Sequence, residues 1–277
     1  MHKELPDLAR ARELVAERGL ALGQPLTILA ETTSTNDEAK RAAKAGAPGG
    51  ATWVAESQTA GRGRQGRAWV SPRGENLLVS VLVRVACTPS RLPPLALVAG
   101  LAARDAVARA APACDPKLKW PNDVVIGPER RKVAGVLVEA LSHGGRVDAL
   151  IVGVGINVHT RDFPEDLAGR ATSIALHAAS PPDRAVVLAD LLAGLDRDLQ
   201  LVASRGLGLV HARLSAADAL RGSRVRTDSD GTSGALPRRG PHQNEGVAEG
   251  IDLDGRLLVR RDDGILARWT AGEVHLV

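Results

Sequence analysis

Residues 56–73 read ESQTAGRGRQGRAWVSPR, and the rest of the chain is best understood by working outward from them. Three glycines, Gly61, Gly63 and Gly66, alternate with arginines. Glycine leaves the backbone free and its N–H groups approachable, while the guanidinium fork fits carboxylates and phosphates. Such a stretch has little to bury in a core. We predict a loop that folds over an anionic ligand and that is disordered over residues 60–70 in its absence.

Three known phosphate-binding patterns compete for this loop. GRGRQG satisfies G-x-G-x-x-G, but a dinucleotide-binding turn requires a helix at the last glycine and an acidic residue about 20 positions later. Here Pro72 and a strand follow, and Arg84 stands at the later position. A P-loop requires Gly-Lys-Ser/Thr, and a protein kinase requires Asp-Phe-Gly, and the chain has neither. A basic loop without function stays open while the loop is considered alone.

Composition limits the class of protein. The chain has 277 residues, 44% of them hydrophobic, which is enough for one medium and one small domain. The net charge is only +4, and the basic residues cluster in the arginine loop and at 130–132. Because nucleic-acid binding requires a basic face, this local clustering favours a small anion, and we expect no DNA partner.

The cellular compartment can be predicted from the two cysteines and from the first residues of the sequence. Cys87 ends an apolar run and Cys114 lies in a loop, so a disulfide is not supported. Residues 1–19 are charged throughout and lack an apolar signal core, and no stretch approaches about 18 apolar residues. We expect a cytoplasmic protein with no membrane partner.

Apolar periodicity predicts alternating strands and helices. Pro93 opens a helix that ends at Pro112, and His143-Gly144-Gly145 joins two strands as a hairpin. The predicted helices span 7–18, 34–44, 93–112 and 184–204, with a further helical piece ending near 220. The predicted strands span 26–29, 51–56, 76–87, 118–120, 124–126, 132–141 and 146–158.

The last part of the chain has a different character. Residues 222–277 contain five short apolar runs separated by Asp-Gly turns, which is typical of a small β-barrel. Residues 227–246 are rich in Ser, Gly, Pro and Arg, and we predict a mobile loop there. The expected organisation is a helical extension at 1–25, a catalytic domain at 26–220 and a C-terminal domain at 221–277.

Five motifs in one order resemble the biotin protein ligases. They are TTSTN (32–36), the arginine loop, KWPNDV (119–124), KVAGVLVE (132–139) and GVGINV (153–158), and residues 250–274 resemble that family's C-terminal domain. The resemblance implies an α+β fold with a mixed β-sheet and flanking helices, related to class II aminoacyl-tRNA synthetases, followed by an SH3-like β-barrel. The short N-terminal part resembles the group without a DNA-binding domain.

The resemblance also implies the chemistry and the residues that perform it. Family members activate biotin with ATP as biotinyl-5′-AMP and then transfer it to one lysine of a biotin carboxyl carrier protein. Arg64 and Lys132 are the implied catalytic residues. The implied biotin contacts are Ser34, Thr35, Asn36, Gln58, Arg62, Gly63, Arg64 and Lys132. The implied ATP contacts are Arg64, Arg67, Trp69, Asn122, Lys132 and Asn157, and Asp123 is a candidate for Mg²⁺ binding through water.

Several positions keep a second interpretation. Ser34 or Thr35 can cap the helix that follows, and Asn122 lies in a Pro-Asn-Asp sequence that is ordinary turn chemistry. Asp123 can hold Mg²⁺ or brace the loop, and Lys132 alone would be a solvated lysine. At the level of function, a lipoate-handling relative and a DNA-binding repressor are the alternatives. A homodimer is left open.

Overall fold

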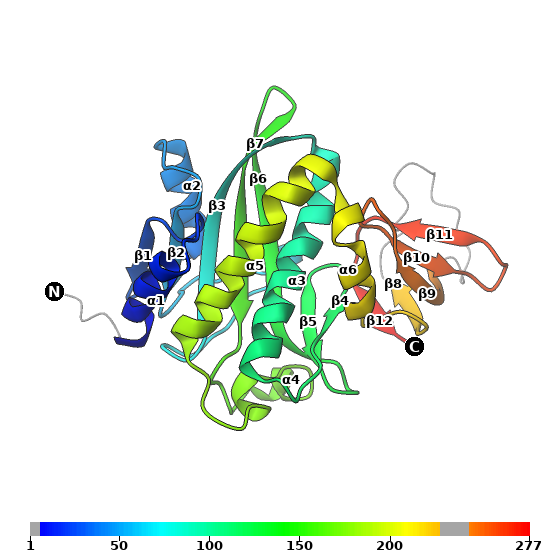
Figure 1. The fold of residues 1–277 in the computed structure, drawn as a ribbon. Helices are drawn as coiled ribbons and strands as arrows, with labels where there is room; N and C mark the ends of the chain where they lie inside the picture. The colour runs from blue at the N-terminus through cyan, green and yellow to red at the C-terminus, as the bar shows by residue number, and fades with distance from the viewer. Residues whose placement is uncertain (1–5, 228–243) are drawn as a thin grey trace.

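The computed structural model describes residues 6–227 and 244–277 as two β-sheets with helices packed on the larger one (Figure 1). The strands of the larger sheet are β1 (Leu26–Leu29), β2 (Thr52–Ala55), β3 (Leu77–Cys87), β4 (Lys117–Lys119), β5 (Asp123–Ile126), β6 (Arg131–His143) and β7 (Arg146–Ile156). The helices are α1 (Pro6–Glu17), α2 (Thr35–Lys44), α3 (Leu92–Ala110), α4 (Glu165–Ala168), α5 (Arg184–Arg205) and α6 (His211–Ala217). The smaller sheet contains β8 (Arg224–Thr227), β9 (Glu245–Ile251), β10 (Leu257–Arg260), β11 (Leu266–Trp269) and β12 (Val274–Leu276).

The larger sheet is mixed, as predicted. Its strand order is β1-β2-β3-β7-β6-β5-β4, in which β1 and β2 run parallel and all other neighbours run antiparallel. The long strands β3, β7 and β6 form its centre. Their register sets Ser80 opposite Gly153, and Gly155 opposite Gly135. This places three glycines and a hydroxyl on adjacent strands.

The two faces of this sheet have different environments. Helices α1, α3 and α5 cover one face (Figure 1). Val79, Val81 and Val83 of β3 belong to the main core on that face. On the other face, Leu82 of β3 packs with Ala39 of α2 in a smaller cluster. Because successive strand residues point to opposite faces, the residues between the core positions face the α2 side. That side is only partly covered and carries the site.

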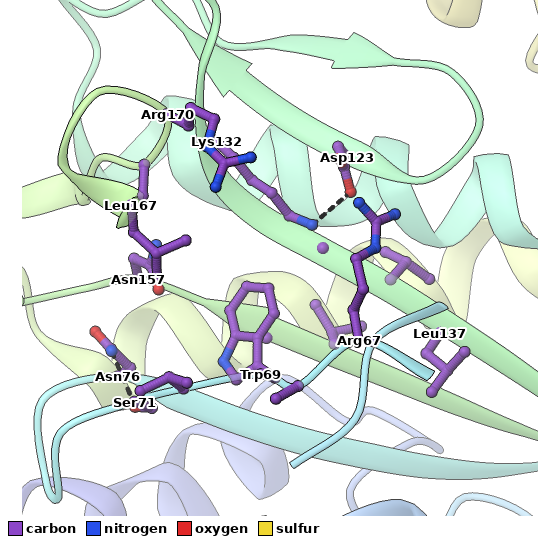
Figure 2. A pocket seen from close by; sticks show the side chains of 18 of the residues that line it. Arg67, Trp69, Ser71, Asn76, Asp123, Lys132, Leu137, Asn157, Leu167 and Arg170 are labelled. Carbon is purple, nitrogen blue, oxygen red and sulfur yellow. Dashed lines mark hydrogen bonds and ion pairs between the residues drawn. The ribbon is translucent and has the colours of Figure 1, made fainter. Parts of the chain in front are cut away.

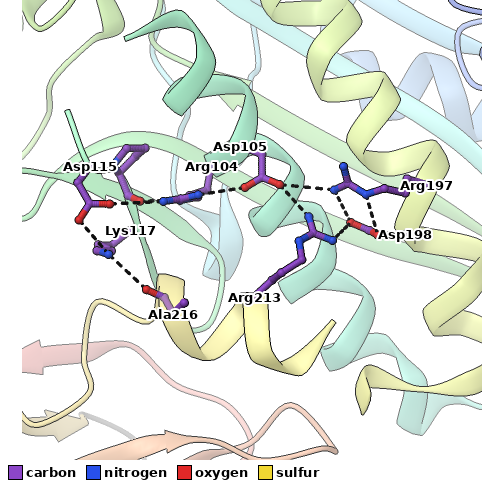
Figure 3. Close-up of polar contacts among 9 residues, drawn as sticks. Arg104, Asp105, Asp115, Lys117, Arg197, Asp198, Arg213 and Ala216 are labelled. Atoms are coloured by element: carbon purple, nitrogen blue, oxygen red, sulfur yellow. Dashed lines mark hydrogen bonds and ion pairs between the residues drawn. The ribbon is translucent and has the colours of Figure 1, made fainter. Parts of the chain in front are cut away.

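An ion-pair network holds the helical layer together (Figure 3). Asp198 of α5 is 2% exposed and accepts hydrogen bonds from Arg197 (2.7 Å) and from Arg213 of α6 (2.8 Å). Asp105 of α3 accepts a second bond from Arg213 (2.8 Å) and adjoins Arg104. A buried carboxylate is stabilised only when it is paired, so this network specifies how α3, α5 and α6 pack.

The smaller sheet has the order β11-β10-β9-β8-β12, and it packs beside the β4 edge of the larger sheet and against α6 through specific contacts (Figure 1). The indole of Trp120, 2% exposed, donates a hydrogen bond to the Gly255 carbonyl (2.9 Å). His211 contacts the Ile251 carbonyl at 2.7 Å. Trp120 is therefore a core residue, as expected from sequence, and it joins the two sheets.

The predicted elements agree with the structure to within a few residues. The hairpin at Gly144-Gly145 is confirmed, since both glycines have positive φ between β6 and β7. Cys87 and Cys114 are both free and buried. Residues 228–243, most of the predicted mobile loop, lie outside the described residues. In the part of the chain that the structure describes, no helix has the length and apolarity that crossing a membrane requires.

Candidate functional site: a cavity with two chemically different ends

A cavity of about 800 Å³ lies on the open face of the larger sheet. Its floor is formed by β3, β6 and β7, one wall by the start of α2, and its cover by residues 57–73, which we call the flap. All the site residues implied by the family resemblance line it, namely Ser34, Thr35, Asn36, Gln58, Arg62, Gly63, Arg64, Arg67, Trp69, Asn122, Asp123, Lys132 and Asn157. The fold thus gathers five separate sequence motifs around one space.

The base of the flap is anchored by a buried arginine. Arg184, 1% exposed, donates to both oxygens of Glu56 (2.7 and 3.2 Å) and to the Asn76 carbonyl (3.3 Å). Asp7 of α1 accepts from the same guanidinium (2.7 and 3.0 Å). Glu56 and Asn76 flank the flap, and the Gly74 N–H closes its base on the Glu56 carbonyl (2.9 Å). The two ends of the flap are therefore held by one side chain.

The tip of the flap is held by its arginines. Arg62 forms a two-pronged pair with Asp37 of α2 (2.5 and 2.7 Å). Arg67 pairs with Glu273 of the smaller sheet's last turn (2.6 Å). The structure thus shows the flap folded over the cavity and in contact with both sheets. Disorder of the free flap stays a prediction.

Trp69 lies flat against the floor of the cavity (Figure 2). A Cβ atom on Gly155 would come within 2.5 Å of the indole, and one on Gly135 within 3.0 Å. The Lys132 ammonium lies 5.3 Å from the ring centroid, within cation–π range. The missing side chains of Gly155 and Gly135 therefore leave room for the indole. The third glycine, Gly153, instead admits the Asn36 amide, whose oxygen would be 2.3 Å from an added Cβ.

One end of the cavity is uncharged and polar. The Gln58 carbonyl oxygen accepts from the Thr35 backbone N–H (2.7 Å) and hydroxyl (3.0 Å), so the Gln58 amide NH₂ is turned toward the cavity. Ser34 is 3% exposed and stands at the N-cap position, but its hydroxyl makes no capping bond. The capping interpretation is therefore wrong for Ser34. This end offers hydroxyl and amide groups to a ligand.

A buried network supports that end from behind. The Ser80 hydroxyl contacts both the Thr35 hydroxyl (2.8 Å) and the Asn36 amide oxygen. Asn36 donates to Glu139 (2.6 Å), which also pairs with Lys40 (2.5 Å). The sequence analysis named Asn36 among the biotin contacts but missed Ser80 and Glu139. Both stand at alternating positions of predicted strands, and that alternation was the available signal.

The other end of the cavity is cationic. Lys132 of β6 pairs with Asp123 of β5 at 2.7 Å (Figure 2). Arg64 donates to the Asn122 amide oxygen at 3.1 Å, and burial lowers the pKa of its guanidinium. An arginine keeps its charge even so, because its pKa starts far above neutral. The two implied catalytic residues thus meet at the cationic end, each beside one member of the PND turn.

A second segment closes the far side of the cationic end. Residues 159–173 cross the end of β6, where the Lys132 N–H donates to the Arg170 carbonyl (2.7 Å). Asn157, 6% exposed, donates to the Thr172 carbonyl (3.0 Å). Figure 2 shows Asn157, Leu167 and Arg170 on the side of Trp69 that faces away from Arg67. An aromatic ring beside an amide and an aliphatic side chain suits a flat heterocycle.

The side chains that line the cavity suit a metal ion only if phosphates supply further ligands. Among the described residues no group of three His, Cys, Asp or Glu side chains could hold a metal ion. Asp123 is a single carboxylate, and it is paired with Lys132. Mg²⁺ commonly binds through one or two carboxylates together with substrate phosphates. Asp123 therefore suits an ion that arrives with a nucleotide.

The fold and the cavity define an α+β protein whose site has a neutral polar end and a cationic end side by side. Two family models match the chain: the biotin/lipoate A/B protein ligase family over residues 28–157, and the biotin protein ligase C-terminal domain over residues 239–277. The chain belongs to the biotin protein ligases.

Individual relatives support this membership. The biotin–[acetyl-CoA-carboxylase] ligase of Mycobacterium tuberculosis is 36% identical over 84% of this chain and 82% of its own length. The bifunctional ligase/repressor BirA of Salmonella typhimurium is 33% identical over 80% of this chain. This chain spans only 65% of the length of that bifunctional relative.

Solved structures agree with the sequence relatives. Biotin protein ligase from Aquifex aeolicus in complex with biotin and ATP superposes with a TM-score of 0.73 at 30% identity, covering 91% of this chain and 98% of that one. Biotin protein ligase from Leishmania major in complex with biotinyl-5-AMP gives a TM-score of 0.55 at 29% identity, covering 89% and 98%. The predicted family and fold class are thereby confirmed.

Proposed function

We propose that this chain is an ATP-dependent biotin–protein ligase that forms biotinyl-5′-AMP and transfers biotin to one lysine of a biotin carboxyl carrier protein. The observation that carries the proposal is the cavity with a neutral polar end and a cationic end under one arginine flap. Biotin has the matching shape, because a neutral ureido ring is joined to a carboxylate by an aliphatic chain. The ligands named for the solved relatives, and the relatives' own names, support the same assignment.

The neutral end suits the ureido ring. A buried polar group without a partner costs about 1–3 kcal/mol, so a selective pocket must supply both donors and acceptors. Gln58 offers its amide NH₂, while Ser34 and Thr35 offer hydroxyl groups. Asn36 acts indirectly here, because both ends of its amide are already bonded to Ser80 and Glu139.

The cationic end suits the activation step. A carboxylate is a poor electrophile, so its oxygen must first attack the α-phosphorus of ATP, which releases pyrophosphate and leaves an acyl-adenylate. Two anions must approach each other for this attack, and fixed positive charge offsets their repulsion. Arg64 supplies a planar fork and Lys132 a point charge at that place. The Arg62–Gly63 backbone and Arg67 lie on the same flap, around the two anions.

Trp69, Asn157 and Asn122 supply the nucleotide side. The indole offers a flat apolar face, and Asn157 lies beside it on the end of β7. Asn122 is bonded to Arg64 and to the Val136 carbonyl (2.8 Å), so in this arrangement it positions the arginine. Contact between Asn122 and the base would require a change of partners on nucleotide binding.

Asp123 would hold Mg²⁺ through water when the ion is bound. The ion would supply further charge neutralisation on the phosphates. Asp123 meanwhile orients the Lys132 ammonium toward the cavity. We also infer a functional division in which residues 26–220 carry the chemistry, residues 221–277 close the cationic side, and the extension at 1–25 supports the base of the flap. The Asp7–Arg184 and Arg67–Glu273 pairs support this division.

Transfer to the carrier follows the same logic. The mixed anhydride has AMP as a good leaving group, so an unprotonated lysine amine from the carrier can displace it and form an amide. The biotin–[acetyl-CoA-carboxylase] names of relatives support a carboxylase carrier domain as the acceptor.

The test is incubation with Mg-ATP, a carrier domain, and either biotin or lipoate. Mass spectrometry is expected to show one lysine of the carrier heavier by a biotinyl group, with ATP required. A carrier variant with that lysine replaced by arginine should gain no mass. Modification with lipoate and not with biotin would reassign the chain to the lipoate branch of its family, and no mass gain with either acid would refute the proposal.

A further inference from the structure

One cation of the cavity has no partner. Seven basic side chains line the cavity, and six of them are bonded within the described residues. The bonded six are Arg62, Arg64, Arg67, Arg130, Lys132 and Arg170, with Asp37, Asn122, Glu273, Ser223, Asp123 and the Asp166 carbonyl as partners. The seventh, Lys119 of β4, makes no hydrogen bond or ion pair to any residue that the structure describes. Lys119 opens the KWPND motif, to which sequence reasoning gave no role for the lysine.

The absence of a partner is unusual because Lys119 is only half-exposed. Burial lowers the pKa of its ammonium. A charged group taken out of water without a partner is costly, so natural proteins seldom keep one unless something binds it. Two acids lie nearby, but Asp123 is paired with Lys132, and Glu273 with Arg67. The ammonium is therefore available to an anion from outside.

The position of Lys119 restricts which anion it meets. Lys119 lines both the main cavity and a small adjoining cleft between the flap tip, the PND turn and Glu273. That cleft holds only about 20 Å³, room for little more than one water molecule. A phosphate that meets Lys119 must therefore lie on its main-cavity side, where Arg64, Arg67 and Lys132 also line the space. The α-phosphate already has Arg64 and Lys132, which leaves the two outer phosphates.

We propose that Lys119 is a further catalytic residue, which binds the β- and γ-phosphates of ATP and stabilises the pyrophosphate as it leaves. The proposal rests on the proposed function. In the step concerned, a carboxylate oxygen of biotin forms a bond to the α-phosphorus, and the bond from that phosphorus to the bridging oxygen breaks. The electron pair stays with the bridging oxygen, so negative charge grows on pyrophosphate. Lys119 donates hydrogen bonds to that charge and transfers no proton.

The experiment compares Lys119→Met with Lys117→Met. Lys117 lies on the same strand two residues earlier and is bonded to Asp115 (2.9 Å) and the Ala216 carbonyl (3.2 Å), away from the cavity (Figure 3). Each variant is assayed for biotin-dependent exchange of pyrophosphate into ATP and, separately, for transfer from supplied biotinyl-5′-AMP to the carrier. Lys119→Met is expected to slow exchange on the order of 100-fold, as loss of one preorganised donor does, and to leave transfer unchanged. Lys117→Met should alter neither step.

Two further measurements keep the outcome clear. Calorimetry with inorganic pyrophosphate alone is expected to show binding to the wild type that Lys119→Met weakens, and Lys119→Arg, which keeps the charge, should recover part of both losses. Equal losses in exchange and transfer would make Lys119 a structural or carrier-binding residue and overturn the proposal, as would unchanged exchange. If the wild type binds pyrophosphate through Lys119 but modifies no carrier, the proposed function fails while the phosphate site stands. If Lys119→Met fails to fold, the affinity of Lys119→Arg for pyrophosphate is compared with that of the wild type. A weaker affinity supports the proposal, and an unchanged affinity overturns it.

Discussion

Replacing Gly155 by alanine tests the position of Trp69 most directly. The added Cβ would lie 2.5 Å from Cε2 and 2.6 Å from Cζ2 of the indole, whereas ordinary contact begins at 3.4 Å. The indole must therefore retreat by roughly 1 Å, and a displacement of that size in a positioning group can cost about 100-fold in rate. Because Trp69 sits on the flap, the flap absorbs the shift and the sheet stays intact.

The assay is adenylate formation from biotin and ATP, measured beside thermal unfolding. Gly155→Ala is expected to lose about 10- to 100-fold in adenylation while biotin affinity changes little, because the neutral end does not contact Gly155. Gly208→Ala is the matched control, since a Cβ there meets nothing within 4 Å. A Gly155→Ala protein with wild-type adenylation would show that the indole does not rest on β7 during the reaction, and our account of the flap would be wrong.

Three other predictions follow from single contacts. Arg64→Ala should lower adenylation on the order of 100-fold. The free energy of unfolding should change by under about 1 kcal/mol, because only the bond to Asn122 is lost. A loss of stability as large as the loss of activity would make Arg64 a structural residue. Glu56→Gln should destabilise the protein by about 2 kcal/mol, because Arg184 loses one of its two carboxylate partners and keeps only Asp7. It should also speed trypsin cleavage of the flap, which biotin and ATP then slow, and unchanged cleavage would refute the anchor. Burial raises the pKa of Asp198, but its two arginine partners outweigh burial and lower that pKa from its ordinary value of 3.8. The stabilising contribution of this carboxylate is therefore present above pH 3.8 and is lost as the pH falls through the lowered pKa. Chemical unfolding of Asp198→Asn should therefore show a smaller loss of stability below about pH 4 than the wild type, and the same loss in both proteins would contradict this.

Local patterns predicted most of the fold. The Gly144-Gly145 turn, the buried run of β3 and the proline that opens α3 each depend on residues close together in sequence. Such signals can be read without knowing the tertiary structure. The motifs then predicted which residues line the cavity, and the structure brings them together.

The contacts between distant residues could not be predicted in this way. Arg184 meets Glu56 across 128 positions, and Arg67 meets Glu273 across 206. An arginine at a predicted helix start is ordinarily solvated, so nothing local marks Arg184 as buried. The same holds for Lys119, whose lack of a partner is a property of the folded protein alone.

The division of the larger sheet into two faces has a consequence for how this protein tolerates change. Residues of β3 that point toward α3 and α5 belong to the main core, whereas those between them point toward α2 and, at Leu78, into the cavity. A saturation scan along β3 and β7 should therefore alternate with a period of two. Core positions would reduce the amount of folded protein in cells, whereas the positions between them that line the cavity, Leu78, Gly153 and Gly155, would reduce turnover while leaving abundance intact. Inherited variation can then retune chemistry on one side of a strand without endangering the scaffold on the other.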